Sequence, residues 1–230
     1  YGILPLLSGT FMTSLVALCL AIPLGTIAAI YLSEFSANWV KEWAKPALEL
    51  LAGVPTVVYG YFALLVVTPI LQVILPNLPG FNVLSAGLVM GIMIIPLVSS
   101  IVEDALRAVP HDLREGSYAM GSTRLQTALH VVFPAATSGV AAAYILAASR
   151  AVGETMIVAV AAGLQPKVIF HPFDEAATIT AYIVQVSLGD VPHDTLQYQT
   201  IFAAGLILVF MTLLLNILGY VLAKRFRESY

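Results

Sequence analysis

The stretch Pro110–Pro134, PHDLREGSYAMGSTRLQTALHVVFP, decides the fold, because it is a polar insert between two long apolar runs. Pro110 suits the first position of a helix, where its missing N–H costs little. Gly121 suits a helix end that needs a positive φ, and Ser122 or Thr123 can cap the helix that follows. The insert is therefore predicted to be two short helices in water, joined by a glycine turn.

Apolar residues recur in the second of these helices at the spacing i, i+3, i+4, i+7 and i+8. This spacing places them in one stripe along a helix, which can pack on another element. The stripe consists of Leu125, Ala128, Leu129, Val132 and Phe133.

The composition places the chain in a membrane. Of its 230 residues, 60% are hydrophobic and only 10% are charged, and the mean hydropathy is +0.93, outside the range of soluble globular domains. A membrane-spanning helix needs about 20 apolar residues, so we predict an all-α, polytopic helical bundle that forms a single domain over residues 1–230. The five predicted spans are Phe11–Leu32, Leu50–Leu75, Val83–Val102, Ala135–Ala162 and Thr200–Ala223.

Basic residues predict the orientation of this bundle. Eight of the ten Lys and Arg residues lie in three regions of the chain. Even numbers of predicted spans separate these regions, so all three lie on the same side of the membrane. The positive-inside rule makes that side cytoplasmic, and it includes the C-terminus and the insert, taken as about residues 106–133. The eight residues are Lys41, Lys45, Arg107, Arg114, Arg124, Lys224, Arg225 and Arg227.

The outer loop contains an apolar segment, Ala176–Leu188, that is too short to span the membrane. Ile179, Ile183 and Val186 repeat there at helical spacing. We interpret the segment as an amphipathic helix that lies at the outer surface, with a re-entrant segment as the alternative.

Two ionised groups, Arg150 and Glu154, lie inside the predicted span Ala135–Ala162. A charge at the middle of the bilayer costs at least about 2.5–3.5 kcal/mol, so both are expected to face protein or water. Side chains four residues apart meet on a helix, so the pair is predicted to neutralise itself in part. The planar guanidinium suits an oxyanion, which predicts an anion path; a structural ion pair is the alternative.

The insert resembles the EAA signature of bacterial ABC-importer permeases, E-A-A-x3-G-x9-I-x-L-P. Glu115, Gly121 and Pro134 match it, whereas Gly116 and Ser117 replace the two alanines. In that family the motif is a cytoplasmic coupling helix that docks on a separate ATPase subunit, so the resemblance implies coupling roles for Glu115, Gly116, Ser117 and Gly121. The alternative is a purely structural turn, because any helix-turn-helix between two spans needs a glycine turn and a proline stop.

Two further segments are similar to phosphate importer permeases of the PstC type. Residues 150–156, RAVGETM, resemble the family's R-A-x-G-E-T-M segment, and residues 53–60, GVPTVVYG, resemble its G-x-P-[ST]-V-V-Y-G segment. The first likeness implies a substrate path that includes Arg150, Glu154 and Thr155. The second segment also has a structural explanation, since Gly53 and Pro55 can break a helix.

The resemblance implies a MetI-like permease subunit of an ATP-driven phosphate importer in the bacterial inner membrane. The implied partners are a second, PstA-like permease subunit, two ATP-binding cassette subunits, a periplasmic phosphate-binding protein and membrane lipid. ATP would be bound by the partner subunit, because the chain has no P-loop motif, and we expect no cofactor, metal or nucleic acid on this chain. Family members have six spans, so a further span is expected before Tyr1.

Two rival functions fit the same sequence. A permease of this class for another oxyanion, such as molybdate or sulfate, would carry the same charges. A secondary anion transporter or channel would need no ATPase, and a test of ATP-dependent uptake separates it from the importer.

The predicted orientation can be tested by labelling from the two sides of the membrane. Cysteines placed at Thr123 and Asp190, in a Cys19→Ser background, should react with an impermeant maleimide from opposite sides, because the insert and the outer loop are separated by an odd number of spans. Comparison of right-side-out and inverted vesicles measures this. Labelling of both positions from one side contradicts the orientation.

Overall fold

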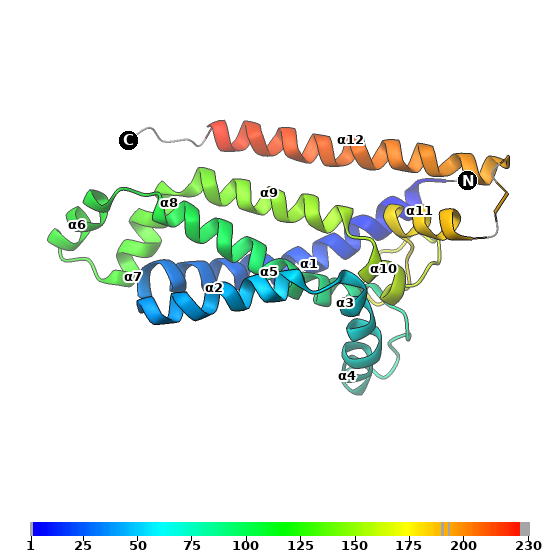
Figure 1. Cartoon of the computed structure of the whole chain (residues 1–230), viewed down its shortest axis with the longest axis horizontal. Helices are drawn as coiled ribbons and strands as arrows, with labels where there is room; N and C mark the ends of the chain where they lie inside the picture. The colour runs from blue at the N-terminus through cyan, green and yellow to red at the C-terminus, as the bar shows by residue number, and fades with distance from the viewer. Residues whose placement is uncertain (1, 190, 193, 226–230) are drawn as a thin grey trace. The chain divides into compact units, whose positions relative to one another are not determined.

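The computed structural model describes residues 2–189, 191–192 and 194–225. Regular structure in these ranges is helical throughout, which confirms the predicted all-α class (Figure 1). Arg227 and Asp190, assigned above to opposite sides of the membrane, lie outside the described residues. The elements are α1 (Leu4–Ile30), η1 (Tyr31–Phe35), α2 (Asn38–Gly53), α3 (Thr56–Phe62), η2 (Ala63–Val67), α4 (Thr68–Ile74), α5 (Val83–Arg107), α6 (His111–Ala119), α7 (Arg124–Thr127), η3 (Ala128–Val132), α8 (Phe133–Ala135), α9 (Thr137–Gly153), α10 (Met156–Ala161), α11 (Ile179–Leu188) and α12 (Leu196–Arg225), where η marks a π-helical turn.

The described residues contain four membrane spans, or five if a bent pair of helices is counted as one, which is roughly consistent with the five predicted. Four helical stretches are long and apolar enough to cross a membrane: Leu4–Phe35, Thr56–Ile74, Val83–Arg107 and Leu196–Val221. A bent pair of helices, Arg124–Ala135 and Thr137–Gly153, makes a fifth span if the two are counted together, and the bend between them is 75°.

The second predicted span starts later than expected, because the chain leaves helical geometry at Val54 and Pro55. Pro55 has φ −56° and ψ 133°, and a residue before proline is also pushed away from helical angles. The predicted break at Gly53 and Pro55 is therefore confirmed. The residues before it form α2, a helix of 16 residues in a region that the sequence analysis treated as a loop.

The chain divides into two compact units, which are described separately. Unit 1 comprises residues 1–20, 54–93 and 148–214, and unit 2 comprises residues 21–53, 94–147 and 215–230. The divisions fall inside α1, α5, α9 and α12, so each of these helices contributes to both units. The single domain predicted over residues 1–230 stays a prediction.

The core of unit 1 joins the start of α1 to α11 and α12. Leu6, Ala177, Ile179 and Ala204 are buried together there. A hydroxyl of α1 supports this core, because Thr10 Oγ1 accepts the N–H of Ile179 at 3.1 Å. The helix predicted in the outer loop is present as α11, but its first turn is enclosed by unit 1 and has no wet face. The position of this helix at the outer membrane surface, or as a re-entrant segment, stays a prediction.

Small residues let α1 and α5 pack closely within each unit. In unit 1 a Cβ added at Gly87 would lie 2.7 Å from Val16 Cβ. In unit 2 a Cβ added at Gly25 would lie 2.7 Å from Val98 Cβ. Such distances are shorter than van der Waals contact, so the helices approach at positions that only glycine permits.

Two of the π-helical turns come just before a proline. η2 precedes Pro69 and η3 precedes Pro134. Proline has no N–H and its ring crowds the carbonyl four residues earlier, so a widened turn relieves the clash. At the end of η2 the carbonyl of Ala63 accepts the backbone N–H of Thr68, and the Thr68 hydroxyl donates to the same oxygen at 3.0 Å. The helix thus continues past the proline.

Within unit 1, α3 packs directly on α10 at Gly60 (Figure 1). A Cβ added at Gly60 would lie 2.9 Å from Val160 Cβ and 3.2 Å from the carbonyl oxygen of Met156. Gly60→Leu should therefore destabilise the protein by roughly 1–3 kcal/mol, the usual cost of overpacking. Thermal unfolding of the purified protein in detergent measures this.

Gly205→Leu is the matched control for Gly60→Leu. A Cβ added at Gly205 meets nothing within 4 Å, so this variant should unfold close to the wild-type temperature. Equal losses of stability in the two variants would contradict the close contact between α3 and α10.

Candidate functional site

Arg150 lies in the last turn of α9, with its side chain exposed in the isolated chain. A cation is favourable at this end of a helix, because the last carbonyls carry partial negative charge. Within the described residues its guanidinium makes no ion pair and no hydrogen bond to another side chain. The donors of Arg150 are thus available to a ligand or to a partner chain.

Glu154 is not on the helical face of Arg150, because α9 ends at Gly153 and α10 begins at Met156. Glu154 Oε1 instead accepts the N–H of Met156 at 3.1 Å, and that of Ile157 at 3.5 Å. The predicted ion pair between Arg150 and Glu154 is therefore wrong. Its physical reason is that the i, i+4 relation holds only in a continuous helix.

The break between α9 and α10 is stabilised by hydroxyl groups. Thr180 Oγ1 donates to the carbonyl of Glu154 at 2.7 Å, and Thr155 Oγ1 donates to the carbonyl of Gly153 at 3.3 Å. Non-helical backbone at membrane depth needs such partners or water. Local sequence spacing does not indicate the role of Thr180, because this residue lies 26 positions from Glu154.

The structure brings the two segments of the PstC-like pattern together in unit 1. Gly60, the last residue of GVPTVVYG, lies against the carbonyl of Met156, the last residue of RAVGETM. Tyr59 beside it is buried. The end of the first segment therefore has a packing role, and Arg150 is the exposed charged residue of the second.

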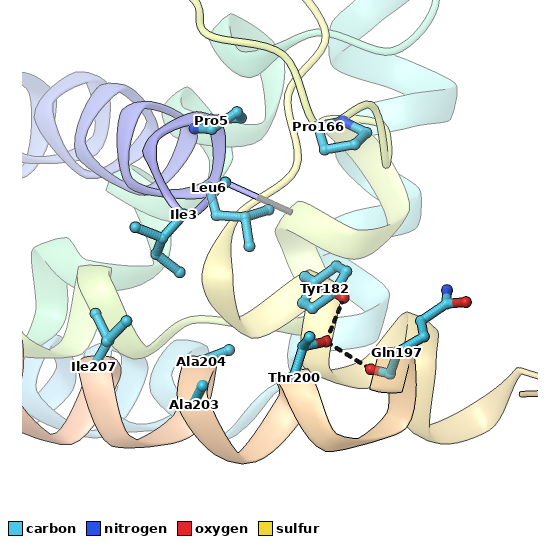
Figure 2. Close-up of a pocket in the computed structure, with 11 residues that line it drawn as sticks. Ile3, Pro5, Leu6, Pro166, Tyr182, Gln197, Thr200, Ala203, Ala204 and Ile207 are labelled. Atoms are coloured by element: carbon cyan, nitrogen blue, oxygen red, sulfur yellow. Dashed lines mark hydrogen bonds between the residues drawn. The ribbon is translucent and has the colours of Figure 1, made fainter. Parts of the chain in front are cut away.

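A cavity of about 470 Å³ in unit 1 is not the place where the predicted path residues gather (Figure 2). Tyr182 Oη and Thr200 Oγ1 are 2.7 Å apart at its wall, and Thr200 Oγ1 also donates to the carbonyl of Gln197. None of the eleven residues that line it is charged, so the cavity suits apolar groups and not an oxyanion. The eleven are Gly2, Ile3, Pro5, Leu6, Pro166, Tyr182, Gln197, Thr200, Ala203, Ala204 and Ile207.

The insert in unit 2 forms the predicted helix, glycine turn and second helix. α6 ends at Ala119, and Gly121 has φ +86°, as predicted. Thr123 caps α7 through a capping box with Gln126. Pro110 differs by one position, since it is the N-cap residue of α6 and not its first helical residue.

Three of the four predicted coupling residues are exposed. The Glu115 side chain is in water, where Oε1 lies 3.7 Å from His111 Nδ1. A Cβ added at Gly116 or at Gly121 would meet nothing within 4 Å. Ser117 points inward, with its Oγ 2.9 Å from Thr127 Oγ1, so it fastens α6 to α7.

The apolar stripe predicted in the second helix of the insert is buried only in part. Ala128 and Val132 are buried, whereas Leu125 and Leu129 are exposed. The π turn η3 lies within the stripe and changes the helical period, so residues spaced for an α-helix do not stay on one face. Met120, in the same insert, is 86% exposed. The insert therefore has exposed apolar side chains.

A hollow of about 390 Å³ lies at the glycine turn of the insert. Its lining is mixed in polarity and includes two of the predicted coupling residues, Ser117 and Gly121. The other lining residues are Met120, Ser122, Gln126, His130 and Val131. The exposed turn thus combines a protruding methionine with a hollow, a shape that suits docking on another protein.

The comparisons with known proteins agree with this geometry. The model of the family "Binding-protein-dependent transport system inner membrane component" matches residues 21–228. The chain is 36% identical to the probable ABC transporter permease protein YqgH of Bacillus subtilis over 98% of this chain and 72% of that protein. It is 32% identical to the phosphate transport system permease protein PstC of Xylella fastidiosa over 97% of this chain and 73% of that protein.

A solved structure of the MetNI methionine ABC transporter, in an inward-facing conformation, shares the fold. The TM-score is 0.70 with 18% identity, over 99% of this chain and 95% of that chain. The apolar spans, the family match and the relatives together identify a polytopic membrane permease of the ABC-transporter class. The chain belongs to the family of binding-protein-dependent transport system inner membrane components.

The new role of the Glu154 carboxylate can be tested by two substitutions. Glu154→Ala removes the acceptor of the first N–H groups of α10 and should cost about 0.5–2 kcal/mol of stability, as loss of a helix cap does. Glu154→Gln keeps a carbonyl oxygen at the same place and should be affected less. Thermal unfolding of both variants measures the difference, and equal losses would contradict the capping role.

Proposed function

We propose that this chain is the permease subunit of an ATP-driven phosphate importer. The observation that carries the proposal is the exposed guanidinium of Arg150 at the helix break between α9 and α10. A planar fork of donors suits two oxygens of a tetrahedral oxyanion. The identity of about one third to relatives named as phosphate permeases supports phosphate as that oxyanion.

The residues at the break have distinct roles in the proposed path. Arg150 contacts the oxyanion transiently as it passes. Thr155 holds the carbonyl of Gly153 by a long bond of 3.3 Å, so its hydroxyl can turn to a substrate oxygen. Glu154 supplies a negative charge beside the path, which limits how tightly phosphate is held and favours its release. Rapid passage requires binding that is weak enough to reverse.

The proposal extends to the assembly in which the chain works. The exposed face of the insert, with Glu115, Gly116, Met120 and Gly121, docks on an ATP-binding cassette subunit. ATP is bound by two such partner subunits. A second, PstA-like permease completes the path, and a periplasmic binding protein delivers phosphate. The chain crosses the bacterial inner membrane, with the insert and the C-terminus in the cytoplasm.

A different oxyanion is the nearest alternative, because sulfate and molybdate offer similar oxygens to Arg150. A secondary anion transporter or channel is the second alternative, and the exposed apolar surface of the insert argues against it. An exposed methionine and two exposed leucines on a polar insert favour a protein partner.

Reconstituted vesicles test the proposal directly. Vesicles that contain the chain and its partners should take up phosphate only with ATP, and excess sulfate or molybdate should not compete. Arg150→Gln should lower the uptake rate at least about tenfold, equivalent to about 1.4 kcal/mol. Arg150→Lys should also be impaired, because a point charge does not reproduce the planar fork.

Lys167→Gln is the matched control for Arg150→Gln. Lys167 is a half-exposed basic residue of unit 1 that pairs with Asp174 at 3.7 Å, away from the helix break. The phosphate uptake rate of the Lys167→Gln variant should stay close to that of the wild type. Uptake without ATP would favour the secondary transporter, and preferred uptake of sulfate or molybdate would identify another oxyanion.

A further inference from the structure

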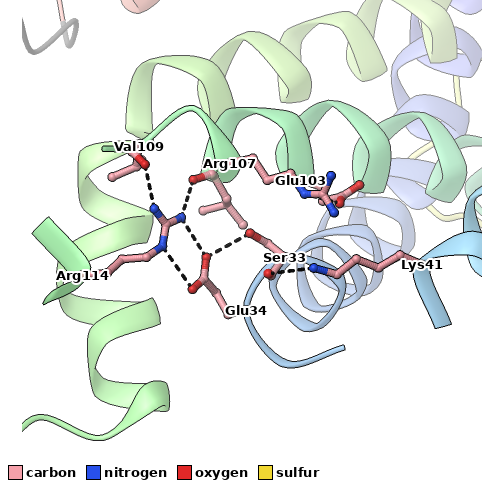
Figure 3. A network of polar contacts seen from close by, with 8 residues as sticks. Ser33, Glu34, Lys41, Glu103, Arg107, Val109 and Arg114 are labelled. Atoms are coloured by element: carbon pink, nitrogen blue, oxygen red, sulfur yellow. Dashed lines mark hydrogen bonds and ion pairs between the residues drawn. The ribbon is translucent and has the colours of Figure 1, made fainter. Parts of the chain in front are cut away.

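Arg114, on the insert helix α6, makes four hydrogen bonds through its guanidinium (Figure 3). Its Nη2 donates to Glu34 Oε1 at 3.0 Å, and its Nε donates to Glu34 Oε2 at 3.4 Å. The side chains of Arg114 and Glu34 are only 10% and 8% exposed. They form a buried, two-pronged ion pair between residues 80 positions apart.

The same guanidinium also bonds the end of α5. Arg114 Nη1 donates to the carbonyl of Val109 at 2.6 Å, and Nη2 donates to the carbonyl of Leu106 at 2.8 Å. The last carbonyls of a helix have no partner within the helix, and a cation is favourable there. Arg114 therefore closes the end of α5 while it holds Glu34.

Glu34 lies in η1, the π-helical turn that continues α1. Its Oε1 also accepts the hydroxyl of Ser33 at 2.9 Å, so both carboxylate oxygens are satisfied. Lys41 Nζ donates to the carbonyl of Ser33 at 3.4 Å, which connects the start of α2 to the same turn. Burying two charges costs free energy, and each of these hydrogen bonds offsets part of that cost. Because the bonds require particular distances and directions, the pair is specific in geometry.

α6 is also fastened on its other side. Ser117 Oγ lies 2.9 Å from Thr127 Oγ1, which holds α6 to α7 across the glycine turn. Only residues 108–110 connect α5 to α6. The insert is thus joined by short links and by one buried arginine to the ends of α1 and α5, all within unit 2.

We propose that Arg114 is a positioning residue that makes α6 move as one body with the ends of α1 and α5. Displacement of α6 by the ATPase is then passed to both helices and is not absorbed by bending at residues 108–110. This inference rests on the proposed function, in which an ATPase docks on the insert. It assigns Glu34 and Arg114 to the transmission of movement, beyond the docking surface itself.

Arg107 provides a matched comparison in the same unit. Its Nε lies 2.8 Å from Glu103 Oε1, and the Glu103 side chain is only 1% exposed. This pair also neutralises a buried carboxylate, but both residues belong to α5. Substitution of Arg107 therefore removes a partner of the buried Glu103 carboxylate, but it breaks no ion pair between two different helices.

A distance measurement tests the mechanical link without any substrate. Spin labels at Asp112 in α6 and Tyr31 in η1, in a Cys19→Ser background, should give a narrow distance distribution in the otherwise wild-type permease. Glu34→Gln and Arg114→Lys should broaden it, and Arg107→Met should not. A distribution that stays narrow in the first two variants overturns the inference.

Transport measurements test the consequence of the link. With Glu34→Gln or Arg114→Lys, the ATPase should still copurify and hydrolyse ATP, but phosphate transported per ATP should fall at least about fivefold, the lower end of typical coupling between sites. Arg107→Met should leave this ratio close to wild type. The exchange Glu34→Arg with Arg114→Glu should not restore it, because a carboxylate cannot donate to the carbonyls of Leu106 and Val109.

The outcomes separate this inference from the proposed function. A wild-type chain that neither copurifies with an ATPase nor transports phosphate refutes the proposed function, whereas the spin-label distances still report on the link. An unchanged ratio of phosphate to ATP, with only the amount of assembled complex reduced, overturns the inference and leaves the pair as a stabiliser of the fold.

Discussion

Backbone N–H and C=O groups need hydrogen-bond partners wherever water is absent, and this constraint governs the structure. Most groups find them inside long helices. Where a proline interrupts the pattern, a π turn lets the helix continue past it, as η2 does before Pro69. Where a helix breaks, side chains supply the hydrogen-bond partners. The Glu154 carboxylate accepts the first N–H groups of α10, and the Thr180 hydroxyl donates to the carbonyl of Glu154 at the break.

The need for hydrogen-bond partners also distinguishes Arg114 from Arg150. Arg114 is buried, and its donors are used by Glu34 and by carbonyls at the end of α5. Such an arginine holds elements together and has little capacity left for a ligand. Arg150 is exposed in the last turn of α9, and its donors are not used by other described side chains. A transient contact with an anion needs guanidinium donors that other side chains do not use. The proposed roles of Arg114 and Arg150 therefore follow from how their donors are used.

The two units therefore carry different parts of the proposed function. Unit 1 holds the helix break with Arg150, Glu154 and Thr155, where the chemistry suits an oxyanion. Unit 2 holds the insert with Glu115, Gly116 and Gly121, where exposed apolar side chains suit a protein partner. Four helices, α1, α5, α9 and α12, contribute residues to both units.

The sequence by itself determined the helical class, most of the membrane spans, the glycine turn of the insert and the family. These features depend on hydropathy and on residues close together in the chain, such as Gly121 followed by the capping residue Thr123. The exposure of Gly116 and the inward direction of Ser117 depend on packing, which the sequence pattern does not contain.

Only the tertiary structure decided which charges pair. Arg150 and Glu154 are four residues apart, yet the end of α9 at Gly153 separates them. Arg114 and Glu34 are 80 residues apart, yet they form a buried pair. Spacing along the chain predicts a contact only while one helix continues, because beyond its end the folding of the whole chain decides which side chains meet.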